Sequence, residues 1–273
     1  MSKQPIVLDI YNFINQIAPF ETAESWDNVG LIIGSTYASA SKVLLALDIT
    51  EEVVEEAIDG HYNLIVTHHP FIFSGIQAIT FEDRQGRFLL KLIQHNISVI
   101  AAHTNLDRSF EYGINRMIAD YFKLQEIKPL STLHRFGVVG KLPASMTFDA
   151  FCDQTKAIFG IEILKVVNAP KADAFQDHTD QIQVVALSSG ASSDFIGDAL
   201  AVKADVYITS DIKYHEAQRV VGTEMILVDV GHFESESIFM KPFKAMLDTF
   251  AVENGYKLDV QVTSAEKPIF VYY

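Results

Sequence analysis

Short apolar runs rich in valine and isoleucine alternate along the chain with longer segments in which apolar residues recur every three or four positions. The first pattern is typical of buried strands and the second of amphipathic helices. The strands are expected at 43–48, 64–67, 97–102, 182–187, 206–209 and 226–230. The helices are expected at 51–59, 88–94, 148–159 and 238–250. Thr50 suits the start of the first helix, because its hydroxyl can cap free N–H groups.

The order of these elements predicts the class of fold. Nearly continuous apolar strands indicate sheets that are covered on both faces, and their alternation with helices indicates βαβ units. We therefore expect an α/β protein with two lobes and largely parallel sheets. The N-terminal α/β lobe is placed at 1–128 and a second α/β lobe at 129–234, and a C-terminal helix and strand at 235–273 are expected to pack back on the first lobe.

Composition and charge exclude several classes of protein. The 273 residues are 49% hydrophobic and 21% charged, as in an ordinary globular protein. The net charge of −14 argues against nucleic-acid binding, unless a basic patch forms around Arg84, Arg87 and Arg108. The single cysteine, Cys152, excludes an internal disulfide. No apolar run reaches the roughly 18 residues that cross a bilayer, and the first residues lack the pattern of a secretory signal. We expect a cytoplasmic protein that does not enter membranes.

Histidines and carboxylates follow four of the predicted strands directly. They are His68 and His69, His103 and Asp107, Asp211 and His215, and His232 with Glu234 and Glu236. Ligands of open α/β sheets bind at the carboxyl ends of strands. Four such strand ends together therefore indicate a ligand site more strongly than any one of them.

The paired histidines His68 and His69 allow two interpretations. Adjacent side chains on a turn point in different directions, so the pair could serve two metal ions, or one ion and a substrate. Pro70 prevents a helix from starting there. Alternatively, both imidazoles could be loop residues that bond to backbone groups.

Two further pairs share a spacing of four residues. His232 and Glu236 would lie on one face of a helix and could bind the same ion, although Glu236 could instead simply favour the positive end of that helix. Asp107 could be a ligand or a helix cap; we favour a ligand, with His103 supporting it. His215 has no carboxylate at a clear chelating distance and could be an ordinary helix histidine. The small-residue turn at 188–193 could offer N–H groups to an anion or be only a tight turn.

Five segments, taken in order, carry a resemblance to a known family. They are Trp26-Asp27-Asn28-Val29-Gly30-Leu31, Thr67-His68-His69-Pro70, His103-Thr104-Asn105-Leu106-Asp107, the segment 209–215 and the segment 229–236. Together they resemble the NGG-interacting-factor-three-like family, often described as GTP cyclohydrolase I type 2 homologues. The resemblance covers most of the chain. It implies a two-lobed α/β protein with a dinuclear metal site between the lobes, assembled into a ring-shaped homohexamer.

The resemblance also implies roles for single residues. His68 and Asp107 would bind one ion, His69 and His232 would bind the other, and Glu236 would bridge the two. The chain departs from the family at Ser210, where a glycine is common, and it lacks room for the inserted domain of longer members.

The implied ligand set suggests a chemistry. Three imidazoles and two carboxylates suit Zn²⁺, Mn²⁺, Fe²⁺ or Ni²⁺, and two such ions would attract an anionic small molecule. A water between the ions could act as the nucleophile. We expect a metal-dependent hydrolase of a phosphorylated or nucleotide-like molecule, in which His103 and His215 orient the ligand or move protons. The alternative is a non-catalytic metal-binding scaffold or regulator that acts through protein partners.

Overall fold

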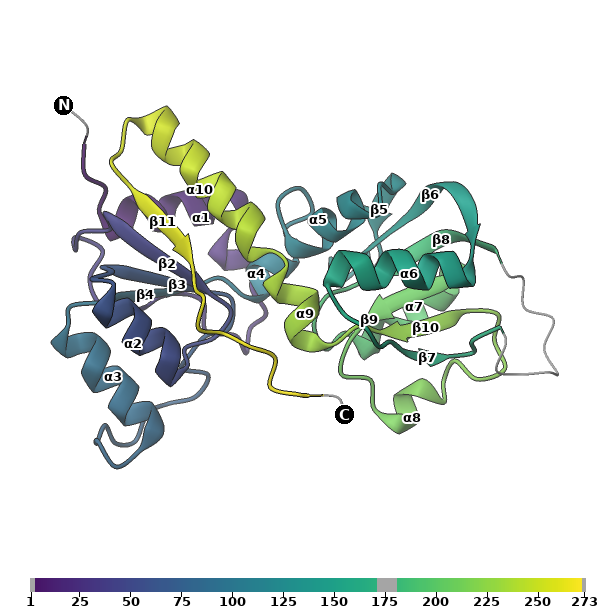
Figure 1. Cartoon of the computed structure of the whole chain (residues 1–273), viewed down its shortest axis with the longest axis horizontal. Coiled ribbons are helices and arrows are strands. Elements are labelled where there is room, and N and C mark those ends of the chain that lie inside the picture. Colours follow the sequence, from purple (N-terminus) through teal and green to yellow (C-terminus); the bar gives the residue numbers. More distant parts are fainter. Residues whose placement is uncertain (1–2, 171–180, 272–273) are drawn as a thin grey trace. The chain divides into compact units, whose positions relative to one another are not determined.

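The computed structural model describes residues 3–170 and 181–271. Its contacts divide the chain into two units, each built around its own sheet (Figure 1). The first unit comprises Met1–Ser109 and Phe239–Tyr273, and the second comprises Phe110–Ile238. The expectation of a mixed α/β protein with two sheets is confirmed. The units change at residues 109 and 238, whereas the sequence pattern suggested 128 and 234.

The first unit contains a five-stranded sheet in the order β1-β4-β3-β2-β11. Its strands are β1 (Gly30–Ile33), β2 (Lys42–Ala46), β3 (Leu64–Thr67), β4 (Ser98–Ala101) and β11 (Asp259–Val262). Four of them run parallel, and β1 is antiparallel to β4. In the centre of the sheet Val66 pairs with Leu45 and Ile100, so the ends of the parallel strands lie level with one another.

Helices cover both faces of this sheet (Figure 1). The helices of this unit are α1 (Val7–Ile17), η1 (Phe20–Thr22), α2 (Glu51–Asp59), α3 (Arg84–Gln94), α4 (Thr104–Asp107) and α10 (Met240–Asn254). On one face Leu44 and Ile65 pack with Val54 of α2 and Phe88 of α3 in a buried apolar cluster. Thr50 caps α2 as expected, since its hydroxyl accepts a hydrogen bond from the N–H of Val53.

The second unit contains a six-stranded sheet in the order β5-β6-β8-β9-β10-β7. Its strands are β5 (Gln125–Pro129), β6 (Val138–Thr147), β7 (Lys165–Val167), β8 (Gln181–Leu187), β9 (Val206–Thr209) and β10 (Ile226–Asp229). Only β8, β9 and β10 run parallel, and the other pairings are antiparallel. The prediction of largely parallel sheets is therefore wrong for this unit. The antiparallel strands β5 and β6 carry many exposed residues, so they lack the continuous apolar runs that marked the other strands.

The helices of the second unit are mostly short. They are α5 (Ile114–Tyr121), α6 (Phe148–Phe159), η2 (Ser193–Phe195), α7 (Ile196–Ala201), α8 (Tyr214–Ala217) and α9 (His232–Ser237). The longest, α6, has the bounds expected from sequence. Its first turn is capped by the Thr147 hydroxyl, and Gly160, with φ 68°, ends it in the left-handed conformation.

Two findings bear on possible partners. None of the helices in the described part of the chain combines the length and the apolar character needed to span a membrane.

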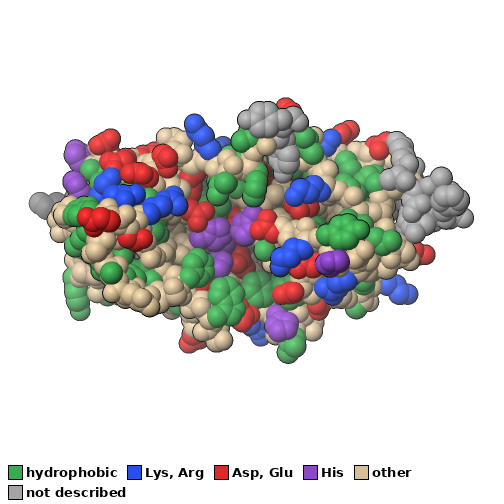
Figure 2. All heavy atoms as spheres, turned by 90° about the horizontal axis from the view of Figure 1, so that it is seen from below, with side chains coloured by type: hydrophobic (Ala, Val, Ile, Leu, Met, Phe, Trp, Pro, Cys, Tyr) green, Lys and Arg blue, Asp and Glu red, His purple; other side chains and the backbone are tan. Residues whose placement is uncertain are grey.

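The three arginines considered as a basic patch each have their own local contact. Arg108 pairs with Glu24 at 3.3 Å. Arg87 donates to the carbonyl of Phe81, and Arg84 lies over the ring of Phe88. On the face drawn in Figure 2, basic side chains are interspersed with acidic ones.

Candidate metal centre

Two strand ends of the first unit bring three histidines together. His68 and His69 follow β3, and His103 follows the neighbouring parallel strand β4. The ring centroids lie 5.0 Å apart for His68 and His69, 5.1 Å for His68 and His103, and 5.4 Å for His69 and His103. One nitrogen of each ring lies within 4.8 Å of the corresponding atoms of the other two. This cluster has the donor atoms and spacing to hold a metal ion.

The backbone beneath these histidines continues the sheet. The N–H of His68 donates to the carbonyl of Ala46 at 3.3 Å, and the N–H of His69 donates to that of Leu47 at 2.9 Å. The N–H of Ala102 donates to the carbonyl of Thr67 at 2.9 Å. The histidines are therefore carried by hydrogen-bonded backbone at the strand ends and not by a loose loop.

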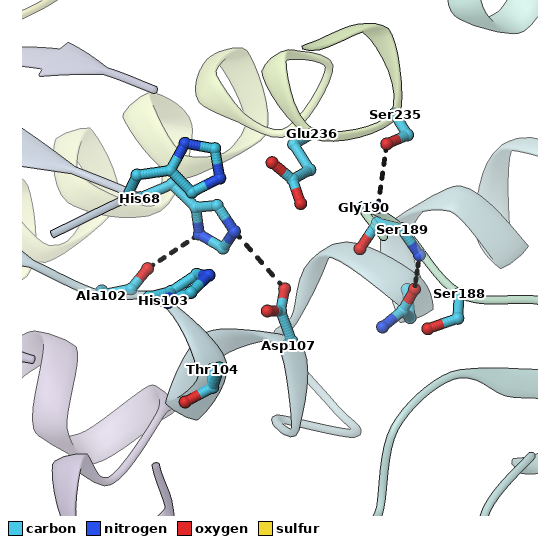
Figure 3. Close-up of polar contacts among 12 residues, drawn as sticks. His68, Ala102, His103, Thr104, Asp107, Ser188, Ser189, Gly190, Ser235 and Glu236 are labelled. Carbon is cyan, nitrogen blue, oxygen red and sulfur yellow. Dashed lines mark hydrogen bonds and ion pairs between the residues drawn. The ribbon is translucent and has the colours of Figure 1, made fainter. Parts of the chain in front are cut away.

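His68 is the most deeply buried of the three. Its Nδ1 lies 2.9 Å from the carbonyl oxygen of Ala102, and its Nε2 lies 3.6 Å from Oδ1 of Asp107, at the end of α4 (Figure 3). A carbonyl oxygen can only accept, so the Nδ1 atom carries a proton, and in the neutral ring the lone pair is then on Nε2. His68 and Asp107, which the family resemblance assigns to one ion, are therefore neighbouring side chains in the first unit.

His69 and His103 repeat this arrangement with carboxylates as acceptors. Nδ1 of His69 lies 3.0 Å from Oδ1 of Asp48, and Nδ1 of His103 lies 3.0 Å from Oδ1 of Asp27. Such carboxylate partners orient metal-binding histidines and increase their basicity. Neither aspartate was predicted to have a role, although Asp48 ends a predicted strand and Asp27 belongs to one of the five family segments.

Asp27 is itself tightly held. Its side chain is shielded from solvent and accepts hydrogen bonds from the N–H of Thr104 at 3.1 Å and from the Thr104 hydroxyl at 2.5 Å. Burial alone would raise the pKa of Asp27, but the hydrogen bonds from His103 and Thr104 outweigh it and lower the pKa to about 2. The carboxylate is therefore ionised at neutral pH and fixes the proton of His103 on Nδ1.

Asp48 is positioned from the other end of the chain. The carboxylate of Glu266 accepts hydrogen bonds from the N–H groups of Leu47 at 2.8 Å and of Asp48 at 2.6 Å. Burial raises the pKa of Glu266 above its ordinary value, although these N–H groups partly oppose that effect. The C-terminal segment thereby holds the backbone of the residue that orients His69.

The second unit presents its own pair of candidate ligands. Helix α9 begins at His232, so His232 and Glu236 lie on one face, with Nε2 of the histidine 3.1 Å from Oε2 of the buried glutamate. Nδ1 of His232 lies 2.8 Å from Oδ2 of Asp211. Asp211 follows β9 in the left-handed conformation, with φ 54°, which aspartate tolerates better than most residues. Asp211 is a third orienting carboxylate, and no role was predicted for it from the sequence.

The turn after β8 packs closely against this helix. The N–H of Gly190 donates to the hydroxyl of Ser235 at 3.0 Å (Figure 3), and a Cβ atom at position 190 would lie 2.3 Å from Oε1 of Glu236. Gly190 also has φ 64°, which favours glycine. Gly190 therefore leaves room for the Glu236 carboxylate, a role that was not predicted from the sequence of this turn.

Tyr207 of β9 supports the same turn and provides a test of it. Its buried hydroxyl donates to the carbonyl of Ser192 at 2.7 Å, and burial raises its pKa. Tyr207→Phe removes this donor and leaves the Ser192 carbonyl only the N–H of Phe195, at 3.2 Å, among its described donors, so we expect the free energy of unfolding to fall by about 1 kcal/mol in urea titrations. The exposed Tyr37 provides a control, since Tyr37→Phe should change stability by less than about 0.5 kcal/mol. Equal effects of the two substitutions would show that the Tyr207 hydroxyl does not support the turn.

His215 lies on the short helix α8. Its Nδ1 is 2.9 Å from Oε1 of Gln218, and its ring lies edge-on to that of Tyr214. These described contacts are local to α8, whereas the contacts of His232 are with Glu236 and Asp211. The role of His215 in orienting a ligand therefore remains a prediction.

Comparisons with known proteins identify related chains. The family model described as Duf34/NIF3 (NGG1p interacting factor 3) matches residues 6–268. A Campylobacter jejuni protein named GTP cyclohydrolase 1 type 2 homolog is 35% identical over 231 residues, which is 85% of this chain and 87% of that protein. A Streptococcus pneumoniae protein of the same name is 33% identical over 253 residues, covering 90% of this chain and 92% of that one. The crystal structure of a hypothetical protein from Staphylococcus aureus has a TM-score of 0.87 at 28% identity, covering 99% of this chain and 100% of that one.

Proposed function

The chain belongs to the Duf34/NIF3 family, and on that premise we propose that it binds two divalent metal ions and uses them to hydrolyse a phosphorylated or nucleotide-like small molecule. In this proposal His68 and Asp107 would hold one ion, His69 and His232 would hold the other, and Glu236 would be shared by both. The support for each ligand comes from the geometry within its own unit.

One observation carries the proposal. In four histidines, Nδ1 lies 2.8–3.0 Å from an oxygen atom that can accept its proton. The four are His68, His69, His103 and His232, and the acceptors are the Ala102 carbonyl and the carboxylates of Asp48, Asp27 and Asp211. In the neutral form of each ring, a proton held on Nδ1 in this way leaves the lone pair on Nε2, where a metal ion can bind it. An oriented set of imidazoles with nearby carboxylates fits Zn²⁺, Mn²⁺, Fe²⁺ or Ni²⁺.

Bound ions would supply Lewis acidity and a water of lowered pKa. The protein groups would supply the orientation and the proton acceptor. Asp27 keeps the proton of His103 on Nδ1, so Nε2 of His103 is the atom that can take a proton from a reacting group. His103 is therefore our first candidate for moving protons, and His215 is the second.

The substrate class follows from charge and from the names of the relatives. Phosphate oxygens are good ligands for divalent ions, so bound ions would favour a substrate with an anionic group even though Asp27, Asp48 and Asp211 add negative charge beside the histidines. The relatives are named as homologues of a GTP cyclohydrolase, so GTP belongs among the compounds to be tested. We also propose that the protein works in the cytoplasm as a homohexamer, which native mass spectrometry can test.

Glu236→Gln tests the metal centre with little change of shape. Wild-type protein supplied with Zn²⁺ or Mn²⁺ should bind about two ions per chain and hydrolyse at least one compound in a panel of phosphoesters and nucleotides. Glu236→Gln should lose at least one ion and the hydrolysis, because a neutral amide is a poor bridging ligand. Elemental analysis after desalting measures the first effect.

Glu234→Gln is the matched control, because Glu234 lies on the same short helix but has no place in the proposed ligand set. It should keep both ions and full activity. If the wild type takes up no metal, the proposal is wrong. If it binds two ions but hydrolyses none of the panel, the non-catalytic scaffold becomes the better interpretation.

A further inference from the structure

Two large aromatic side chains remain exposed beside His103. Trp26 is 60% exposed and Phe73 is 53% exposed. The ring of Trp26 lies 5.9 Å from that of His103 at an interplanar angle of 73°, and the ring of Phe73 lies 6.0 Å from it at 85°. Neither ring stacks on the imidazole, so both keep aromatic surface open to solvent next to the histidine cluster.

The exposure of Trp26 does not result from a loose segment. The next residue, Asp27, is shielded from solvent and accepts three hydrogen bonds from His103 and Thr104. The side-chain amide of Asn28 donates to the carbonyl of Ile72 at 2.6 Å. These contacts anchor the backbone on which Trp26 stands, and they tie it to the segment that carries Phe73.

Phe73 is anchored in the same way. Phe71 and Ile72 pack against the apolar core of the first unit, and the ring of Phe71 lies 5.9 Å from that of Phe88. The side-chain amide of Gln85 donates to the carbonyl of Phe71 at 3.0 Å. The residues just before Phe73 are therefore held inward while Phe73 itself faces solvent. Exposed apolar groups that a fold holds in place beside a polar cluster are typical of ligand sites.

We propose that Trp26 and Phe73 bind the planar ring of a heteroaromatic ligand next to His103. Base stacking on aromatic side chains needs accessible aromatic surface, and more than half of the surface of each of these two residues is exposed. The inference rests on the proposed function for the anionic part of the ligand and narrows its class to molecules that carry an aromatic ring. All residues of this ring site belong to the first unit.

Trp26 is the single tryptophan of the chain, so its fluorescence reports directly on this site. The full-length protein, with and without Zn²⁺, is titrated with guanosine 5′-monophosphate and with ribose 5-phosphate, which has the sugar phosphate but no ring. The nucleotide should quench Trp26 and bind about 5- to 100-fold more tightly than ribose 5-phosphate, as expected for one stacked base.

Two substitutions make the test specific. Phe73→Leu should weaken binding of the nucleotide by about 5- to 50-fold and leave the affinity for ribose 5-phosphate and the metal content unchanged. Phe73→Tyr should keep wild-type affinity because it keeps the ring. Phe81 is 50% exposed but has no described ring contact with His103, so Phe81→Leu is the matched control and should have no effect.

Several results would overturn the ring site. They are equal binding of the two probes, an unchanged nucleotide affinity in Phe73→Leu, or a blue shift of Trp26 emission with protein concentration, which would show that a second copy covers the ring. The failure of the proposed function would give a different result. If no metal binds but the nucleotide still quenches Trp26, the proposed metal centre is wrong and the ring site is retained.

Discussion

Gly190→Ala is expected to displace Glu236 and to cost the protein a metal ion, although position 190 is not itself a ligand. The new Cβ atom would lie 2.3 Å from Oε1 of Glu236, well inside contact distance. Glu236 is buried on α9, and the N–H of Gly190 donates a hydrogen bond to the hydroxyl of Ser235 on the same helix. Neither the Glu236 side chain nor the backbone at position 190 can therefore move away easily. We expect metal affinity to fall by at least about 10- to 100-fold, as when a residue that positions a ligand is lost.

Gly160→Ala separates this collision from the cost of the backbone conformation. Gly160 has φ 68°, close to the 64° of Gly190, but a Cβ atom there meets nothing within 4 Å. Both substitutions should therefore lower the free energy of unfolding by about 1–2 kcal/mol through the left-handed conformation. Only Gly190→Ala should also reduce the metal content, measured by elemental analysis and by competition with a chelating dye. Equal metal content in the two variants would argue against Glu236 as a ligand.

Asp27→Asn is expected to destabilise the first unit more than any other single change to an orienting carboxylate. The side chain accepts hydrogen bonds from Nδ1 of His103 at 3.0 Å and from the N–H and hydroxyl of Thr104 at 3.1 Å and 2.5 Å. An asparagine replaces one acceptor oxygen by an N–H donor that faces these donors. We expect a loss of about 2–4 kcal/mol in the free energy of unfolding.

The pH dependence identifies the carboxylate as the cause. The pKa of Asp27 is lowered from 3.8 to about 2 in the folded protein, so its stabilising contribution is complete above the unfolded pKa and is lost as the pH falls towards 2. The stability gap between wild type and Asp27→Asn, measured by urea unfolding of metal-free protein, should therefore shrink by about 2 kcal/mol between about pH 5 and pH 2.

Asp48→Asn provides the comparison, because the half-exposed Asp48 side chain has one described hydrogen bond, to His69. It should cost about 1 kcal/mol or less. A gap for Asp27→Asn that does not change with pH would show that the charge of Asp27 contributes nothing to folding.

Local patterns predicted a large part of the architecture. The helices Glu51–Asp59 and Phe148–Phe159 and the strands Leu64–Thr67 and Val206–Thr209 have the predicted bounds. Caps, apolar runs and helical periodicity all lie within the segments themselves, so they can be read without knowing the fold. The four-residue spacing of His232 and Glu236 is local in the same sense, and α9 places both side chains on one face.

The prediction that histidines at different strand ends lie together depended on how the strands pair. His68, His69 and His103 could be expected near one another only if β3 and β4 were parallel neighbours, as the pairing shows. By contrast, the antiparallel strands β5, β6 and β7 were not foreseen, since much of their surface is exposed and their residues mix polar and apolar types. The pairing of β11 with β2 brings a strand from the last part of the sequence into the sheet of the first unit.

The orienting groups came from the folded structure alone. Asp27 reaches His103 across 76 positions in sequence, and Asp48 and Asp211 each reach their histidines across 21. Position 190 requires glycine because the Glu236 carboxylate occupies the space that a Cβ atom would need. Residue types and short spacings name the groups that can bind a metal, because that chemistry belongs to single side chains. Which carboxylate orients which imidazole depends on contacts between distant segments, which form only when the chain folds.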